Sequence, residues 1–294
     1  MKILVTGRDG QLARSLTEIA KGEAFELVAV GRPTLDLVGH DTIQKALEVL
    51  QPDLVINAAA YTAVDTAESE CATAVAVNCN GAGALAAHCA EHDIPIIHIS
   101  TDYVFDGSKT MPYIETDPVN PLGIYGHSKL EGERQVAAAN PRHIILRTAW
   151  VYSAFGSNFV KTMLRLAVTR EEISVVADQV GNPTYAPHLA TAILNLATHL
   201  NIHNDEDRWG IYHCAGTGDT TWYAFAREIF ERSTEQGLKV PRVCAITSAD
   251  YPTLARRPEN SRLDCHKLEA VFGIRLPEWK QGVRECLARL LTAT

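Results

Sequence analysis

The stretch KILVTGRDGQLARSL, residues 2–16, decides the fold, because a short apolar run leads through a glycine turn into a helical pattern. The run Ile3–Val5 predicts a buried strand. After it, Gly7, Gly10 and Ala13 form the spacing Gly-x-x-Gly-x-x-Ala. The first glycine allows a tight turn, the second lets the backbone approach a pyrophosphate, and the small third residue allows close packing of the helix. Because a helix N-terminus also attracts phosphate, the stretch predicts a dinucleotide-binding site.

Beyond this stretch, apolar runs and helical patterns continue to alternate through the first half of the chain. Strands are predicted at 27–30, 54–56, 96–99 and 144–146, and helices at 12–20, 42–50 and 72–92. The strand runs are continuously apolar, which is typical of a parallel sheet that is covered on both faces. The predicted fold class is therefore α/β, a doubly wound parallel sheet of the Rossmann type with right-handed crossovers.

After about residue 155 the pattern becomes less regular. Prolines at 183, 187, 241, 252 and 258 mark loops, and helices are predicted at 158–170, 187–200 and 222–232. We expect an NADP-binding Rossmann domain over 1–155, completed by chain crossings from the second half. Residues 156–294 are expected to form mainly a second, smaller α/β substrate domain.

Composition excludes several functional classes. The 294 residues are 46% hydrophobic and 21% charged, with a net charge of -8 and no dense Lys/Arg cluster, which argues against nucleic-acid binding. No run approaches the ~20 apolar residues of a membrane helix. The seven cysteines are odd in number and contain no CxxC pair, so neither a disulfide framework nor a zinc site is expected. We expect a cytoplasmic enzyme that acts on a small molecule, as a monomer or homodimer.

The end of the second predicted strand indicates the cofactor. An acidic residue at this place binds the ribose 2′-hydroxyl of NADH, whereas an arginine suits a 2′-phosphate. Here the strand ends in Gly31-Arg32, without an acid at its tip. Arg32 therefore favours NADPH, although Asp36 follows closely enough that NADH could also be accepted.

The segment Tyr125-Gly126-His127-Ser128-Lys129 supplies a candidate proton-transfer pair, since positions i and i+4 share one face of a helix. A nearby ammonium lowers the pKa of a tyrosine from its usual value of ~10 by stabilising the phenolate. Tyr125 can then act as a general acid toward the oxygen of a carbonyl that accepts hydride. Thr101, at the end of the fourth strand, could bond the same oxygen, or it could be a helix cap or turn residue.

Together these segments resemble the extended short-chain dehydrogenase/reductase family, and within it the dTDP-4-dehydrorhamnose reductases. The runs that carry the resemblance are TGRDGQLA (6–13), INAAAYTAVDTAESE (56–70), STDYVFDG (100–107), PLGIYGHSKLEGE (121–133), LRTAWVY (146–152), NFVKTMLRLA (158–167), DQVGNPT (178–184) and ARRPENSRLD (255–264). The runs in the second half are the more discriminating, because that domain selects the substrate.

The resemblance implies a role for each matching residue. Tyr125 would donate the proton, and Lys129 would bind the nicotinamide ribose and tune Tyr125. Other cofactor contacts are implied for Gly10, Gln11, Leu12, Asp36, Leu37, Ala60, Tyr61, Thr62 and Ile99, beside Gly7 and Arg32. Sugar contacts are implied for Thr101, Asp102 and Trp150, with Tyr103 and Val64 nearby. Arg256, Arg257 and Arg262 could bind the diphosphate through paired hydrogen bonds or could form surface salt bridges instead.

The implied reaction reduces the C4 keto group of dTDP-4-dehydro-β-L-rhamnose to dTDP-β-L-rhamnose with NADPH, in dTDP-rhamnose biosynthesis for cell-surface polysaccharide. Two departures from the family pattern stand out: Ala13 replaces its usual third glycine, and Tyr185-Ala186-Pro187-His188 lacks the carboxylate with which some relatives bind a metal at their dimer interface. We therefore expect no metal.

Two classes of alternative stay open. One is another nucleotide-sugar enzyme, a 4-epimerase, reductase or 4,6-dehydratase, although a dehydratase typically has Asp-Glu after the catalytic Thr where this chain has Asp102-Tyr103. The other is a non-catalytic, NADP-binding regulatory subunit with the same fold.

Overall fold

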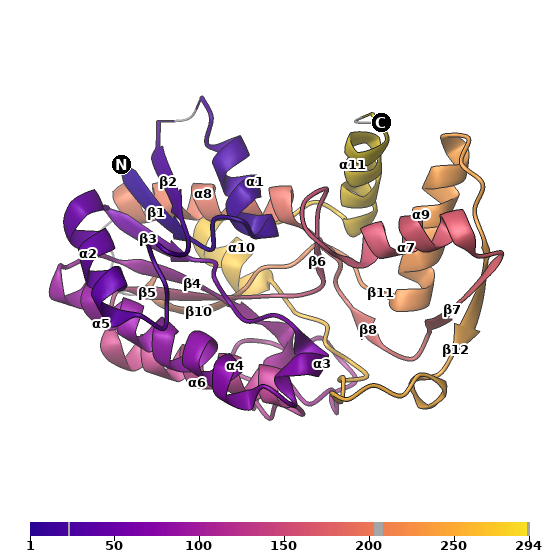
Figure 1. The fold of residues 1–294 in the computed structure, drawn as a ribbon, viewed down its shortest axis with the longest axis horizontal. Helices are drawn as coiled ribbons and strands as arrows, with labels where there is room; N and C mark the ends of the chain where they lie inside the picture. Colours follow the sequence, from indigo (N-terminus) through magenta and orange to yellow (C-terminus); the bar gives the residue numbers. More distant parts are fainter. Residues whose placement is uncertain (23, 203–207, 293–294) are drawn as a thin grey trace.

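The larger of two lobes is built on a six-stranded parallel sheet (Figure 1). The structure is a computed structural model, and it describes residues 1–22, 24–202 and 208–292. The strand order is β10-β5-β4-β3-β1-β2. The strands are β1 (Lys2–Thr6), β2 (Glu26–Val30), β3 (Leu54–Asn57), β4 (Ile96–Thr101), β5 (His143–Thr148) and β10 (Gly210–His213). The predicted doubly wound parallel sheet is confirmed.

Helices cover both faces of this sheet, because successive side chains of a strand point to opposite sides. Ile3 and Val5 pack on one side with α1 (Gln11–Ile19), α8 (Ala186–Ile202) and α10 (His266–Phe272). Leu4 packs on the other with α2 (His40–Leu50), α5 (Ala82–Glu91) and α6 (Ile124–Ala139). Strands buried on both faces explain the continuous apolar runs of the sequence. Three of these elements, β10, α8 and α10, come from the second half of the chain.

The helix predicted at 72–92 is interrupted. It consists of α4 (Cys71–Val75), a π-helical turn η1 (Ala76–Gly81) and α5. In the π-helical turn, the Asn78 side chain accepts a hydrogen bond from the Tyr61 backbone N–H at 2.8 Å and donates one to the Tyr61 carbonyl at 3.0 Å. This long-range contact with the loop after β3 accompanies the widened turn, and such turns are frequent at functional sites.

The smaller lobe lies beside the carboxyl ends of the sheet strands (Figure 1). Its helices are α7 (Phe159–Thr169), α9 (Trp222–Glu235) and α11 (Trp279–Leu291), around a core rich in aromatic side chains. Its strand pairs are β7 (Glu172–Val176) with β12 (Arg242–Ile246), β8 (Val180–Gly181) with β11 (Thr220–Thr221), and β6 (Val151–Tyr152) with β9 (Thr184–Tyr185). Short helices α3 (Val64–Ala67), η2 (Asp102–Val104) and η4 (Ser248–Asp250) connect the elements. Within the described part of the chain, every helix is too short or too polar to span a bilayer.

A buried ion pair fastens α6 to the sheet. Arg147 of β5 donates to the Glu133 carboxylate of α6 through Nε at 2.9 Å and an η nitrogen at 2.7 Å, and both side chains are at most 3% exposed. The Ser100 hydroxyl of β4 donates to the same carboxylate at 2.5 Å. Because removal of one partner leaves a buried charge without compensation, this pair strongly constrains the position of α6.

We expect Glu133→Ala to lower the free energy of unfolding by about 3–5 kcal/mol, since it leaves the Arg147 guanidinium buried and unpaired. Urea unfolding followed by circular dichroism measures the change. Glu131→Ala is the control, because it removes an exposed ion pair with Arg134 from the same helix and should cost less than about 1 kcal/mol. Equal costs for the two variants would show that the buried pair does not fasten the helix.

Candidate active site

The glycine turn after β1 is shaped for close approach of a ligand's phosphate. Gly7 has φ +77°, and a Cβ added there would lie 2.9 Å from the Ala59 Cα, so only glycine fits. The Gly10 N–H donates to the Gly7 carbonyl at 2.8 Å and closes the turn. Gly10 is the N-cap residue of α1, and no side chain of the described residues caps this helix. The N–H groups of its first turn and the positive end of its dipole therefore face outward, as a pyrophosphate requires.

Gln11 and Leu12 contribute to this turn through their backbone. The Gln11 side chain turns toward the smaller lobe, where its carbonyl oxygen accepts hydrogen bonds from Ser153 at 2.9 Å and Asn158 at 2.8 Å. Leu12 is buried against the sheet. The cofactor contacts expected of these two residues would thus be made by N–H groups, whereas the Gln11 side chain joins the two lobes.

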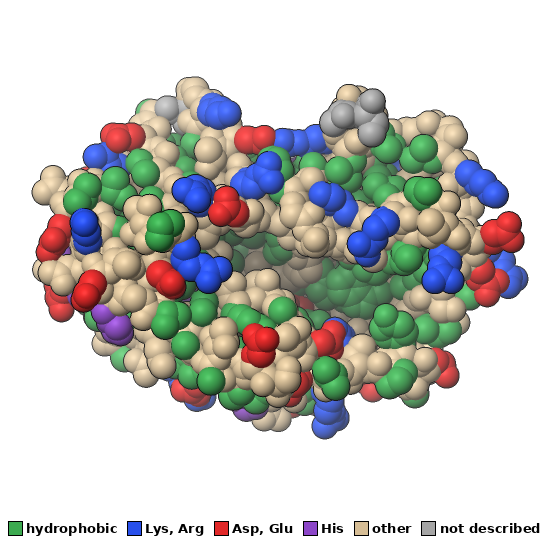
Figure 2. Space-filling view, in the orientation of Figure 1, with side chains coloured by type: hydrophobic (Ala, Val, Ile, Leu, Met, Phe, Trp, Pro, Cys, Tyr) green, Lys and Arg blue, Asp and Glu red, His purple; other side chains and the backbone are tan. Residues whose placement is uncertain are grey.

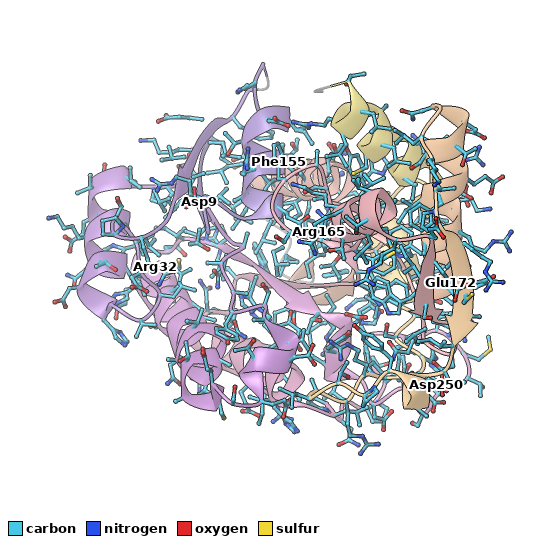
Figure 3. The ribbon with its side chains drawn as sticks, turned by 45° about the vertical axis from the view of Figure 1, so that its right-hand side comes forward. Asp9, Arg32, Phe155, Arg165, Glu172 and Asp250 are labelled. Carbon is cyan, nitrogen blue, oxygen red and sulfur yellow. The ribbon has the colours of Figure 1, made fainter. Side chains whose placement is uncertain are left out.

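Two arginines flank the end of β2. Arg32 is exposed directly after the strand, and the Arg8 backbone N–H donates to the Val30 carbonyl at 3.1 Å. Figure 3 shows Arg32 in the larger lobe, on the same side as Asp9 of the glycine turn. Asp36 instead accepts a bond from the Val38 N–H at 3.1 Å, and Leu37 is buried in the core. Paired guanidinium groups suit a 2′-phosphate. Arg8 was missed in the sequence, although it lies inside the glycine turn.

The segment after β3 forms a second wall of the site. The Asn78 side chain holds the backbone of Tyr61, and the Tyr61 hydroxyl donates to Glu70 at 3.0 Å. Ala60 is half-buried and Thr62 is exposed. These residues, expected to line the cofactor groove, therefore form a loop that is fixed at its centre.

The proposed acid lies at the start of α6, beside the end of β4. The Thr101 hydroxyl donates to Asp102 Oδ1 at 3.1 Å and lies near enough to the Tyr125 hydroxyl to oppose the rise in its pKa. The Tyr103 ring packs edge-on against the Tyr125 ring with centroids 5.9 Å apart. Gly126 permits this packing, because a Cβ there would lie 2.3 Å from the Tyr103 carbonyl oxygen. Thr101 also accepts a hydrogen bond from the Tyr103 N–H at 3.2 Å, so it caps η2 as well.

Burial favours the uncharged form of each titratable group here. It raises the pKa of Tyr125 to about 12, an effect that the Thr101 hydroxyl opposes and the Asp102 carboxylate reinforces. Burial lowers the pKa of Lys129 to about 8, against the opposing charge of Glu133. The Lys129 ammonium donates to the Ile99 carbonyl at 2.7 Å, so Ile99 contributes its backbone to the site.

Asp102 is buried with a polar atom unsatisfied. Burial raises its pKa to about 7, although hydrogen bonds from Ser261 and Thr101 oppose the shift. Its Oδ2 atom has no hydrogen-bond partner within residues 1–22, 24–202 and 208–292. An unpaired buried acceptor is costly, and a ligand hydroxyl would satisfy it.

Trp150 forms an aromatic wall together with a residue that sequence reasoning missed. Its ring stacks on Trp222 of α9 with centroids 3.5 Å apart, and Gly181 lies directly behind it. Trp150 has φ +44°, a strained conformation for a bulky residue that the surrounding contacts must maintain. Figure 2 shows a hollow between the lobes with apolar side chains at its base and Lys and Arg side chains around it.

Of the three arginines expected near a diphosphate, two form ion pairs. Arg257 contacts Asp65 at 2.7 Å and bonds the Tyr103 hydroxyl, and Arg262 contacts Asp219 at 2.9 Å. Arg256 is exposed and lines a small pocket with Val64, Glu68, Tyr103, Leu122, Gly123, Tyr125, Gly126, Ala255 and Pro258. The structure thus brings Val64 and Arg256 to the proposed acid, while Arg257 and Arg262 both lie in salt bridges, the alternative that the sequence left open.

A metal site is not evident in the part of the chain that the structure describes, where no three His, Cys, Asp or Glu side chains are grouped to hold an ion. The segment Tyr185–His188, which lacks a carboxylate, approaches one from another helix: His188 Nε2 forms a hydrogen bond with Glu285 of α11 at 2.8 Å.

Comparisons with known proteins agree with this geometry. Residues 1–292 match the family described as the RmlD substrate binding domain. A dTDP-4-dehydrorhamnose reductase of Sinorhizobium fredii is 48% identical over 99% of this chain and 98% of its own. A crystal structure of a dTDP-4-dehydrorhamnose reductase from Clostridium acetobutylicum has a TM-score of 0.92 at 40% identity, covering 99% of this chain and all of that one. One from Bacillus anthracis, in complex with NADP, has a TM-score of 0.90 at 35% identity, covering 98% and 99%. The chain therefore belongs to the dTDP-4-dehydrorhamnose reductase family.

Proposed function

We propose that the protein reduces the C4 keto group of dTDP-4-dehydro-β-L-rhamnose to dTDP-β-L-rhamnose with NADPH. The observation that carries this proposal is the meeting of Thr101 and Tyr125 at the end of β4, with Lys129 one helical turn further along α6. Carboxyl ends of parallel strands are where such folds bind their ligands. Family membership supports the substrate class, and the position of Tyr125 supports its role as the acid.

Burial raises the pKa of Tyr125, whereas the Tyr125–Lys129 spacing predicted a lowered value, so Tyr125 on its own is a weaker acid than a free tyrosine. At neutral pH its hydroxyl is protonated, so it can transfer H⁺ to the C4 oxygen as this becomes an alkoxide. Thr101 would donate a hydrogen bond to the same oxygen, and the Lys129 ammonium would stabilise the phenolate that remains. Ketone, hydride and proton together give the alcohol, so the atoms and charges balance.

The residues of the glycine turn and of the first turn of α1 fit a dinucleotide. NADPH, when bound, supplies the hydride. The N–H groups of Gly10, Gln11 and Leu12 would bind its phosphates, Arg32 and Arg8 its 2′-phosphate, and Lys129 a ribose hydroxyl. Asp36 and Leu37 would lie near the adenosine, and Ala60, Tyr61, Thr62 and Ile99 along the groove.

The opposite side of the hollow would bind the sugar nucleotide. Asp102 would accept a hydrogen bond from a sugar hydroxyl through its unpaired oxygen, and Trp150 would cover the sugar ring. Val64, Tyr103 and Arg256, which line the small pocket beside Tyr125, would lie close by, with Arg256 toward the diphosphate. Arg257 would reach the diphosphate only by giving up its ion pair with Asp65. We propose that residues 156–294 provide most of this substrate side, and that the protein acts in the cytoplasm as a monomer or homodimer.

Tyr125→Phe should lower kcat by about 10²- to 10⁴-fold, because it removes the proton donor while keeping the ring. The Kd for NADPH should stay within a few-fold of the unaltered protein. Steady-state oxidation of NADPH with the keto sugar and fluorescence titration of NADPH measure the two quantities. Tyr103→Phe is the comparison, because it removes a neighbouring hydroxyl and should raise KM more than it lowers kcat. Unchanged turnover in Tyr125→Phe would exclude Tyr125 as the acid.

Arg32→Ala should raise the Kd for NADPH about 10- to 100-fold, the value of one or two charge-assisted hydrogen bonds, and leave the Kd for NADH unchanged. Arg165→Ala is the control, because Arg165 is an exposed arginine of α7 in the smaller lobe (Figure 3). Equal loss of affinity for both nucleotides in Arg32→Ala would contradict a specific contact with the 2′-phosphate.

A further inference from the structure

A row of buried polar side chains crosses the sheet and ends at Lys129. It runs from Thr6 of β1 through Asn57 of β3 to His98 of β4, and each of these side chains is at most 2% exposed. The Thr6 Oγ1 atom lies 2.7 Å from Asn57 Oδ1, and Asn57 Nδ2 lies 3.0 Å from His98 Nδ1. The other ring nitrogen, His98 Nε2, lies 3.2 Å from Lys129 Nζ. The mechanism above uses only the last member of this row.

The direction of this hydrogen-bond chain is set at its far end. The Ala59 backbone N–H can only donate, and it donates to Thr6 Oγ1 at 3.0 Å. The Thr6 hydroxyl hydrogen is then directed to the carbonyl oxygen of Asn57. If the amide were reversed, this hydroxyl would have no acceptor among the contacts made by the described residues. The Asn57 NH₂ group is therefore the side that faces His98.

The amide in turn selects the tautomer of His98. Because Asn57 donates to Nδ1, that nitrogen carries no hydrogen, and the neutral imidazole carries its hydrogen on Nε2. Burial and the positive charge of Lys129 hold the pKa of His98 well below its usual value, so the ring is neutral. The Nε2–H group then points at Lys129 Nζ, where it suits an amine and opposes an ammonium.

We propose that His98 and Asn57 are positioning residues that direct the amino group of Lys129 and set its protonation state through this hydrogen-bond chain. As an amine, Nζ donates to the Ile99 carbonyl and accepts from His98 Nε2–H, which leaves one hydrogen for a ligand. As the ammonium that the mechanism uses, it keeps only the Ile99 contact and is disfavoured by His98. The functional consequence rests on the function proposed above, in which Lys129 contacts the cofactor and tunes Tyr125.

Other charged groups near this row of side chains also affect the protonation of Lys129 and His98. Glu133 favours the ammonium of Lys129, but its carboxylate is already paired with Arg147. His143 of β5 disfavours charge on His98. Tyr125 lies on the same helix, and Asp102 acts on Tyr125. Among the described contacts, Ile99 supplies the acceptor for Nζ, and none of these groups supplies a second one. The tautomer of His98 therefore decides whether Nζ meets a second acceptor or a donor.

The tautomer can be measured in the unaltered protein by ¹H–¹⁵N NMR with ¹⁵N-histidine. His98 should appear as a neutral ring protonated at Nε2 that does not titrate near neutral pH. His213 is the internal control, because it is equally buried and its Nδ1 faces the carbonyls of Tyr113 at 3.0 Å and Asp264 at 3.2 Å. It should show the opposite tautomer, and its signals are identified by their loss in His213→Gln. Finding both rings protonated at Nδ1 would overturn the proposal.

Two variants test the effect on Lys129. Asn57→Asp offers acceptors to both neighbours, so His98 should carry its hydrogen on Nδ1 and present Nε2 as an acceptor to the ammonium. We expect NADPH affinity and kcat to fall at high pH as Lys129 loses its proton. In Asn57→Asp this fall should move up by about one pH unit or more. His98→Gln should move it in the same direction, because its amide can turn its oxygen to the ammonium. His213→Gln should leave both profiles in place.

The outcomes separate this proposal from the function itself. If the unaltered protein binds NADPH but reduces no keto sugar, the proposed function fails. The tautomer of His98 and the pH profile of NADPH binding still test the proposal about the hydrogen-bond chain. If the enzyme is active and the folded variants keep the original profile, or shift it to lower pH, the proposal about His98 and Asn57 is wrong. Should neither variant fold, the NMR measurement decides alone.

Discussion

The attachment of α6 to the carboxyl ends of β4 and β5 is the constraint on which the site depends. Lys129 and Glu133, one turn apart, are both buried against the sheet, where Lys129 meets His98 and Ile99 and Glu133 meets Arg147 and Ser100. Buried charges of this kind tolerate little displacement, since each must keep its partners. The first turn of the helix is thereby held beside Thr101, which brings the Tyr125 hydroxyl to the end of the strand. A site that must align a hydroxyl with the oxygen of a reacting carbonyl benefits from support on rigid elements.

The electrostatics of the site share one physical cause. Burial moves the pKa of Tyr125 up, that of Lys129 down and that of Asp102 up, so each shift favours the neutral form. A ligand that brings phosphates, hydroxyls and a polarised carbonyl would supply the partners that these groups lack. The basic residues flanking β2 and the uncapped start of α1 add the positive potential that such a ligand requires, although the chain as a whole carries a net charge of -8.

Much of the fold and part of the site could be predicted from the sequence. Continuous apolar runs identified five sheet strands, and the glycine turn and the Tyr125–Lys129 spacing identified the two ends of the candidate site. Asn57, His98 and Arg147 could not be found in this way, because they are single polar residues inside apolar strands and acquire partners only when distant segments pair. The sixth strand, β10, was missed because its sequence, GIYH, is not a continuous apolar run. In the sequence, Trp222 cannot be distinguished from an ordinary residue of its helix, because its partner Trp150 comes from a distant segment.

The central claim, that this site reduces a nucleotide-linked 4-keto sugar, is tested most directly by following NADPH absorbance with dTDP-4-dehydro-β-L-rhamnose. The sugar is prepared from dTDP-glucose with a 4,6-dehydratase and a 3,5-epimerase, and a reaction without the epimerase serves as the control. Our account predicts one NADPH oxidised for each dTDP-β-L-rhamnose formed, and none in the control. Tight binding of NADPH without any oxidation in the complete mixture would contradict it.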